Sequence, residues 1–233
     1  MLRKVSKGVR IFYKNILLRH ASLLSNVFLW KVLSVLLTLL YKINKIGSVY
    51  MRELWTERLH IRDFSPEDWK DLHEYLSDKK VLRYEPYDAF TEEESRQEAA
   101  KRSKNQDFYA VCLADTNKVI GNLYFSEQNF GTWELGYVFN AAYQGKGYAC
   151  EAATALLQNA FVKLGARRVV AMCNPENIAS WRLLERLGMR REGHLLQNIF
   201  FRRDEQGEPI WQDTFEYAIL SDEWKRRTVK EEQ

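Results

Sequence analysis

The sequence predicts an α/β (α+β) fold, and the stretch from residue 133 to residue 173 carries most of that prediction. Residues 133–140 have the pattern of a strand, and residues 168–173 have the pattern of another. Between them lie a glycine-bearing loop and a helix with one apolar stripe. The stripe recurs at i, i+3, i+4, i+7, i+8 and i+11, at Ala153, Leu156, Leu157, Ala160, Phe161 and Leu164. The segment is therefore predicted to be a βαβ unit.

The flanking segments add further strands and helices. Residues 57–64 alternate apolar and charged side chains, which predicts the first strand. Ser65, followed by Pro66 and two acids, predicts the start of a helix. Thr91 and Glu94 form a capping box for a second helix, which we expect to run to about Lys104.

Four more strands complete the expected elements. Residues 107–113 and 119–126 are predicted to pair as a hairpin around a polar turn. Gly165 is expected to end the striped helix. Two further strands are expected near residues 195–201 and 211–220, with a polar loop between them.

The length and composition of the chain suit one sizeable domain plus an additional segment. The chain has 233 residues, of which 46% are apolar, enough to bury a full core. Its cysteines, Cys112, Cys150 and Cys173, are odd in number and lack metal-ligand spacing. We therefore expect no metal site and no disulfide framework, and a reducing, cytoplasmic location.

Charge divides the chain near residue 50. Residues 1–50 contain nine basic side chains and no acidic one. Subtracting these from the totals of 35 basic and 31 acidic residues leaves residues 51–233 with 26 against 31, a net charge of −5. This mildly acidic domain suits a cationic substrate better than a nucleic acid.

The first fifty residues form a basic, hydrophobic extension with three interpretations. Residues 21–41 are leucine-rich and long enough to cross a bilayer, but Lys31 in their middle opposes insertion. The extension could be a membrane-associated helix, or a helical hairpin packed on the domain. It could also be a leader foreign to the working protein, since the charge pattern changes abruptly at Met51. We favour this third interpretation.

The glycine-bearing loop between the strand at residues 133–140 and the striped helix indicates which kind of ligand the protein binds. A turn between a strand and a helix exposes main-chain N–H groups at the helix N-terminus, and such groups bind phosphate oxygens. Gly145 and Gly147 lack a Cβ, so a diphosphate can approach the main chain closely. The loop predicts a phosphate-bearing cofactor.

Gln144, Gly147 and Ala149 have the spacing Gln-x-x-Gly-x-Ala, which resembles the acyl-CoA pyrophosphate loop of the GNAT acetyltransferases. Asn177 and Ser180 follow at the family's spacing, and residues 51–220 look most similar to the RimJ/RimL-like branch. The resemblance implies a GNAT fold, with a mixed, strongly twisted sheet of about seven strands and helices on both faces. It also implies acetyl-CoA as cosubstrate, a primary-amine acceptor, and a monomer or homodimer.

The resemblance assigns roles to individual residues. Glu134, on the strand that enters the loop, matches the general base, and its apolar neighbours in sequence would make its carboxylate a stronger base. A main-chain N–H near Val138 or Phe139 would stabilise the oxyanion. Ser180 matches a proposed acid, whereas Leu184 stands where many members have a tyrosine. A structural salt bridge for Glu134 and a main-chain hydrogen bond for Ser180 are the alternatives.

The expected cofactor contacts come from the end of one strand, the loop after it and the start of a later helix. They are Val138, Phe139, Gln144, Gly145, Lys146, Gly147, Tyr148, Ala149 and Asn177. Acceptor contacts are expected from residues 84–90 and 199–210. The resulting prediction is an N-acetyltransferase acting on a protein or peptide N-terminus. The alternatives are a polyamine, amino sugar or aminoglycoside acetyltransferase, and an acyl-CoA sensor without turnover.

Overall fold

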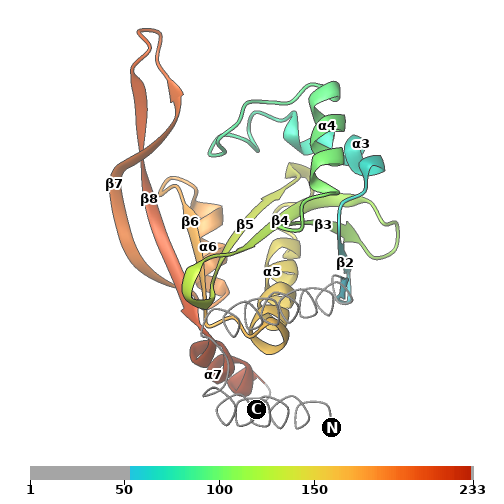
Figure 1. The fold of residues 1–233 in the computed structure, drawn as a ribbon, viewed down its shortest axis with the longest axis vertical. Coiled ribbons are helices and arrows are strands. Elements are labelled where there is room, and N and C mark those ends of the chain that lie inside the picture. The colour runs from blue at the N-terminus through green and yellow to red at the C-terminus, as the bar shows by residue number, and fades with distance from the viewer. Residues whose placement is uncertain (1–52, 232–233) are drawn as a thin grey trace, which may run out of the picture. The chain divides into compact units, whose positions relative to one another are not determined.

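A computed structural model describes residues 53–231, so the predictions made for residues 1–50 lie outside the described residues. Figure 1 shows these residues as one sheet flanked by helices. The strands are β1 (Leu54–Trp55), β2 (Leu59–Arg62), β3 (Phe108–Leu113), β4 (Val119–Glu127), β5 (Thr132–Phe139), β6 (Arg168–Cys173), β7 (Arg190–Arg203) and β8 (Pro209–Leu220). The helices are α3 (Trp69–Leu76), α4 (Glu92–Arg102), α5 (Tyr148–Asn159), α6 (Ile178–Arg186) and α7 (Ser221–Glu231). No helix in this part of the chain is long and apolar enough to cross a membrane.

The described sheet has eight strands in the order β1-β2-β3-β4-β5-β6-β8-β7. We predicted about seven, and the additional strand is β1, whose two residues pair with Ile61 and His60 at the sheet edge. Every neighbouring pair is antiparallel except β5 and β6. The sheet is therefore mixed, as predicted.

The two faces of the sheet carry separate apolar cores. On β3, Tyr109 and Val111 pack into the core under α5, α6 and α7, whereas Ala110 and Cys112 pack into the core under α3. This period of two is the ordinary alternation of a strand. Helices cover both faces, as predicted.

The predicted helix signals are present at their expected residues. Ser65 caps a short 3₁₀ helix (Pro66–Asp68) that leads into α3, and Thr91 and Glu94 form the capping box of α4. The apolar stripe belongs to α5 and to a π-helical turn (Ala160–Leu164) that continues it, and Gly165 ends this turn at φ 71°.

The parallel pair in the middle of the sheet is short. β5 pairs with β6 only from Thr132 to Glu134, opposite residues 168–170. From residue 135 to Phe139, β5 continues along β4 alone. The two central strands therefore diverge, and the opening lies beside the second half of β5.

Candidate active site

The predicted phosphate loop joins β5 to α5 and opens onto a cavity. Gly145 and Gly147 both have left-handed backbones, at φ 73° and φ 84°, which residues with a Cβ rarely adopt. Gly147 is the N-cap of α5, and no side chain caps the helix. The first main-chain N–H groups of α5 are therefore available to an anion, in the arrangement that suits a diphosphate.

Interactions outside the loop fix its conformation. Arg58 donates from Nη1 to the Lys146 carbonyl at 3.1 Å and from Nε to Glu151 at 2.7 Å. Its guanidinium lies 4.6 Å from the centre of the Tyr148 ring. Thr56 donates to the same carboxylate at 2.5 Å. The sequence analysis missed this anchor, because Thr56 and Arg58 precede the loop by almost ninety residues and carry no motif of their own.

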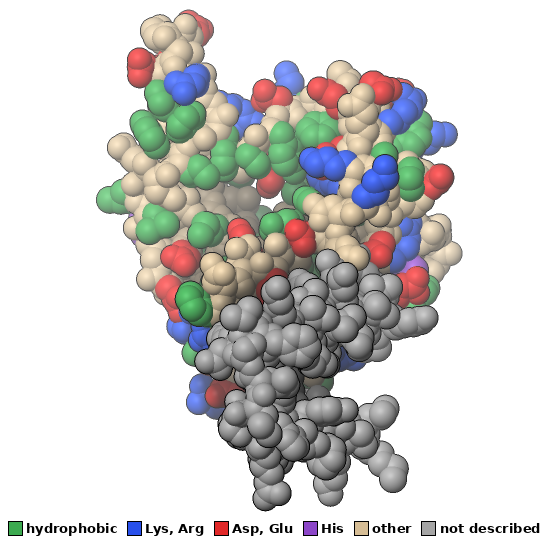
Figure 2. Space-filling view, viewed as in Figure 1, with side chains coloured by type: hydrophobic (Ala, Val, Ile, Leu, Met, Phe, Trp, Pro, Cys, Tyr) green, Lys and Arg blue, Asp and Glu red, His purple; other side chains and the backbone are tan. Residues whose placement is uncertain are grey.

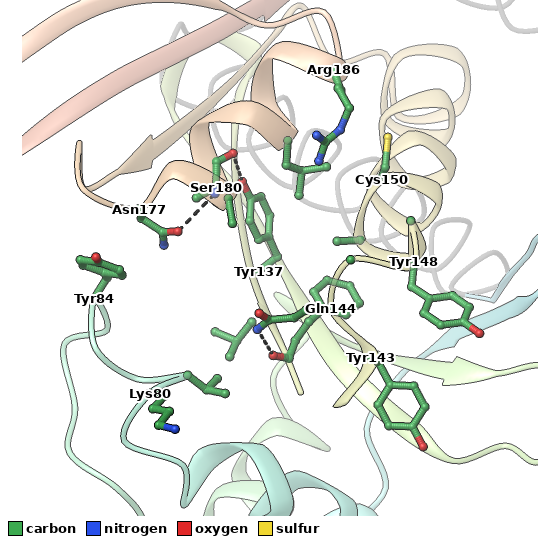
Figure 3. A pocket seen from close by; sticks show the side chains of 18 of the residues that line it. Lys80, Tyr84, Tyr137, Tyr143, Gln144, Tyr148, Cys150, Asn177, Ser180 and Arg186 are labelled. Carbon is green, nitrogen blue, oxygen red and sulfur yellow. Dashed lines mark hydrogen bonds between the residues drawn. The ribbon is translucent and has the colours of Figure 1, made fainter. Parts of the chain in front are cut away.

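Gln144 turns its side chain back to the strand. Its amide nitrogen donates to the Phe139 carbonyl at 2.9 Å, as Figure 3 shows. Asn140 donates its main-chain N–H to Ile120 at 2.9 Å. Since donors alternate along an antiparallel ladder, the Phe139 N–H points away from β4, toward the side where β6 has diverged. Of the two predicted oxyanion donors, Phe139 is the one directed into the opening.

A hydroxyl pair lies across the opening from the loop. Asn177 caps α6 by accepting from the Ser180 N–H at 3.2 Å, and the Ser180 Oγ lies 2.9 Å from the Tyr137 hydroxyl. Burial raises the pKa of Tyr137 well above its ordinary value, so the phenol stays protonated. Asn177 is thus the N-cap of α6, and Tyr137 adds a second O–H beside that of Ser180.

The far wall of the cavity comes from the segment between α3 and α4. Lys80, Val81, Tyr84 and Glu85 line it. Glu85 is mostly buried, and this burial raises the pKa of its carboxyl to about 7, while a hydrogen bond with Tyr87 partly opposes the rise. The structure thus places a carboxylate that titrates near neutral pH inside the cavity.

Glu134 lies elsewhere. It pairs with Ser126 of β4, is half-buried, and accepts a hydrogen bond from Gln128 at 3.3 Å. The residues that line the cavity do not include it. Its expected apolar setting is absent for a simple reason: Trp133 and Leu135 face the opposite side of β5 and pack in the α5 core.

The cavity encloses about 510 Å³ and unites most of the predicted site. Figure 3 shows the α6 residues, the loop and the Lys80–Tyr84 wall around one space. The predicted residues that line it are Val138, Phe139, Gln144, Gly145, Gly147, Tyr148, Ala149, Asn177 and Ser180. Lys146 lies on the same loop, with its ammonium 5.4 Å from the centre of the Tyr143 ring. Within residues 53–231, no group of three or more ligating side chains could hold a metal ion.

Comparison with known proteins fits this geometry. The pattern of the family described as "Acetyltransferase (GNAT) domain" matches residues 58–190. The uncharacterized N-acetyltransferase YnaD of Bacillus subtilis is 42% identical over 172 residues, which cover 72% of this chain and 97% of YnaD.

Two solved acetyltransferase structures align with most of this chain. The crystal structure of a GNAT-family acetyltransferase from Bacillus anthracis aligns with a TM-score of 0.67 at 39% identity, covering 73% of this chain and 99% of that one. Spermidine N-acetyltransferase from Vibrio cholerae, in complex with CoA and spermine, aligns with a TM-score of 0.61 over 73% of this chain and 99% of that chain. At 20% identity the latter shows the fold alone. The chain belongs to the GNAT family of N-acetyltransferases, the enzymes that use acetyl-CoA.

Proposed function

We propose that this enzyme transfers acetyl from acetyl-CoA to the α-amino group of a protein or peptide N-terminus, in the manner of the RimJ/RimL-like branch. One observation carries the proposal: a single cavity joins the uncapped start of α5, the Ser180–Tyr137 hydroxyl pair and the Glu85 wall. The uncapped start of α5 would bind the acetyl donor, the hydroxyl pair would assist the leaving thiolate, and the Glu85 wall would receive the acceptor amine.

The loop fits the donor. Main-chain N–H groups of residues 145–149 would hold the diphosphate, and a Cβ built on Gly145 would meet no atom within 4 Å, so the main chain there is open to a ligand. Asn177 and the second half of β5 would flank the pantetheine arm. When bound, acetyl-CoA supplies the thioester whose acyl group is transferred.

The remaining groups suit acyl transfer. The Phe139 N–H would donate to the oxyanion that forms on the thioester carbonyl, an interaction typically worth about 3–4 kcal/mol. Ser180 and Tyr137 would donate a hydrogen bond to the departing sulfur. A CoA thiol ionises near pH 8–9, much as cysteine does, so this assistance is helpful rather than essential.

The β7–β8 hairpin, which contacts the acceptor-side turn through Arg202, offers a surface for a large acceptor. The β7–β8 hairpin extends past the rest of the sheet in Figure 1. Figure 2 shows apolar side chains gathered on the hairpin beside a hollow, and the exposed ones are Leu195, Leu196, Ile199, Ile210 and Trp211. A polypeptide can follow such a surface after its first residue has entered the cavity, whereas a small amine cannot use it.

A small amine is the second candidate. The side chains of Tyr84, Glu85 and Asp88 put one aromatic ring and two carboxylates close together in sequence on the acceptor side, and this combination suits a polyamine or an aminoglycoside. The number and spacing of the cysteines support a cytoplasmic location.

Thiol release from acetyl-CoA tests the proposal. The full chain is assayed with a peptide bearing a free N-terminus, the same peptide with that amine blocked and a lysine retained, spermidine and an aminoglycoside. We expect release with the first peptide only. A preference for spermidine or the aminoglycoside would replace the acceptor. Acetyl-CoA binding in calorimetry without release from any amine would favour a sensor and overturn the proposal.

A further inference from the structure

Glu85 stands out among the cavity residues, because the proposed reaction needs a base and the sequence assigned that task to another residue. We propose that Glu85 is the general base that deprotonates the acceptor amine, an inference that rests on the proposed function.

The position of Glu85 suits a base for the acceptor amine. Glu85 lies in a turn after α3, where its main-chain N–H donates to the Leu82 carbonyl at 3.0 Å. It lines the same cavity as Tyr137 and Ser180. Burial is the main cause of the raised pKa of Tyr137, and the negative charge of Glu85 adds to it. The carboxylate is therefore within electrostatic reach of the hydroxyl pair, on the acceptor side of the cavity.

The surroundings keep the carboxylate available. Arg102 is the cation whose charge lowers the pKa of Glu85, and its side chain is only 2% exposed. Its guanidinium is committed to Glu98 at 2.9 Å and to the Asn122 side chain at 3.0 Å. Within residues 53–231, Glu85 itself forms no ion pair; Tyr87 is its hydrogen-bond partner. A carboxylate locked in a salt bridge could not accept a proton easily, whereas this one can.

Other charged or titratable groups also face the cavity. They are Lys80 and Tyr84 from the same segment, Tyr137 from β5, Tyr143, Tyr148 and Cys150 from the loop and α5, and Arg186 from α6. Tyr75 of α3 joins the network behind Glu85 through its bond to Asn122 at 3.2 Å. Arg102 is the cation that favours the carboxylate form of Glu85, and burial outweighs its effect.

The turn that carries Glu85 is held from the hairpin. Arg202 of β7 donates to the carbonyls of Leu82, Arg83 and Tyr87 at 3.3–3.4 Å and to the Asp88 carboxylate at 3.3 Å. These contacts fix both ends of the turn. The turn that carries Glu85 is thus held in place by a residue of the β7–β8 hairpin.

With Glu85 as the base, every bond and proton of the acetyl transfer is accounted for. The acceptor arrives as an ammonium ion, and Glu85 takes one proton from it to become a neutral carboxylic acid. The free amine forms a C–N bond to the thioester carbonyl, and the C–S bond breaks as the oxyanion collapses. The nitrogen loses its second proton to the departing thiolate, directly or through Ser180 and Tyr137, and Glu85 releases its proton to solvent after turnover.

The proton affinities favour an N-terminal amine. An α-amino group has a pKa of about 7.7–8.0, within about one unit of the value that burial gives Glu85. A lysine-type amine has a pKa of about 10.4, more than three units away. Proton transfer to Glu85 is therefore close to balanced for an N-terminus and unfavourable by more than a thousandfold for a lysine-type amine.

A pH series with three glutamate variants tests the assignment. kcat/KM for the free-amine peptide is measured from pH 5.5 to 9.5 for the wild type, Glu85→Gln, Glu134→Gln and the surface control Glu93→Gln. Acetyl-CoA affinity is measured for each by calorimetry. Glu85→Asp serves as a second variant that keeps a carboxylate in the turn.

We expect the wild-type rate to rise through an apparent pKa near 7, and Glu85→Gln to lose 10²–10⁴-fold at pH 7.5 while binding acetyl-CoA normally. Its pH profile should lose the inflection near pH 7 and follow the ionisation of the amine alone, a change that a merely structural role would not produce. Glu85→Asp should retain the inflection at a lower rate.

Distinct results separate the two proposals. If the wild type acetylates the peptide but Glu134→Gln carries the loss and Glu85→Gln does not, the function stands and Glu85 is not the base. If the wild type binds acetyl-CoA yet acetylates no amine, both proposals fall.

Discussion

Replacing Glu85 by glutamine should stabilise the protein above neutral pH. The carboxyl has a pKa of about 7 in the folded chain against 4.5 in its ordinary state, and burial is the main cause. A group whose pKa is raised by folding contributes stability that is present below the unfolded value and lost as pH rises through the folded value. The loss here falls between about pH 4.5 and 7.

The magnitude follows from the shift. The difference of about 2.5 units corresponds to about 3 kcal/mol of unfolding free energy at about 1.36 kcal/mol per unit. Glutamine has a similar shape and no charge to bury. We expect Glu85→Gln to exceed the wild type by up to about 3 kcal/mol at pH 8 and to approach it at pH 4.5.

Urea unfolding at both pH values measures this difference, with Glu93→Gln as an exposed carboxylate control. A gap between wild type and Glu85→Gln that does not change with pH would refute the reasoning. So would a variant that is less stable than the wild type at pH 8. Greater stability with lower activity is the expected signature of a functional group kept at an energetic cost.

Three further predictions concern the donor side. Gly147→Ala should lower stability by about 1–2 kcal/mol and weaken CoA binding in calorimetry, because the residue has φ 84° and its Cβ would lie 3.4 Å from Arg58. Unchanged melting would contradict this. Arg58→Gln should raise KM for acetyl-CoA several-fold in steady-state assays with little change in kcat, since it anchors the loop main chain; an unchanged KM would remove that role. Ser180→Ala and Tyr137→Phe should each lower kcat, and the double variant should fall no further, because both remove the same hydrogen bond. Additive losses in the cycle would show that the two hydroxyls act independently.

The local parts of the site could be predicted from sequence. The glycine loop and the α5 stripe each depend on residues within a few positions of one another, and the structure places them as expected. The opening beside β5 comes from the three-residue β5–β6 pair, which no local pattern specifies.

Acceptor contacts were expected at residues 84–90, and Tyr84 and Glu85 of that segment line the cavity, but the role of Glu85 could not be predicted. Glu85 lies in an irregular turn with no periodic pattern, and its environment comes from α4, β5 and β7. Only the folded chain brings these elements together. For Glu134, neighbours in sequence suggested an apolar setting, but alternation along β5 sends those neighbours to the other face of the sheet.

The contacts of Arg202 have a consequence for how substrate preference can change. Arg202 of the hairpin and Tyr87 are separated by 115 positions in the chain, yet the hydrogen bond between them joins the hairpin to the turn that carries Glu85. The diphosphate loop belongs to a different unit, anchored by Arg58. Substitutions in the turn and hairpin can therefore redirect the enzyme to a new amine without disturbing its acetyl donor. A chimera that exchanges both segments together should carry the preference of its parent, whereas exchanging either one alone would separate the turn from its brace.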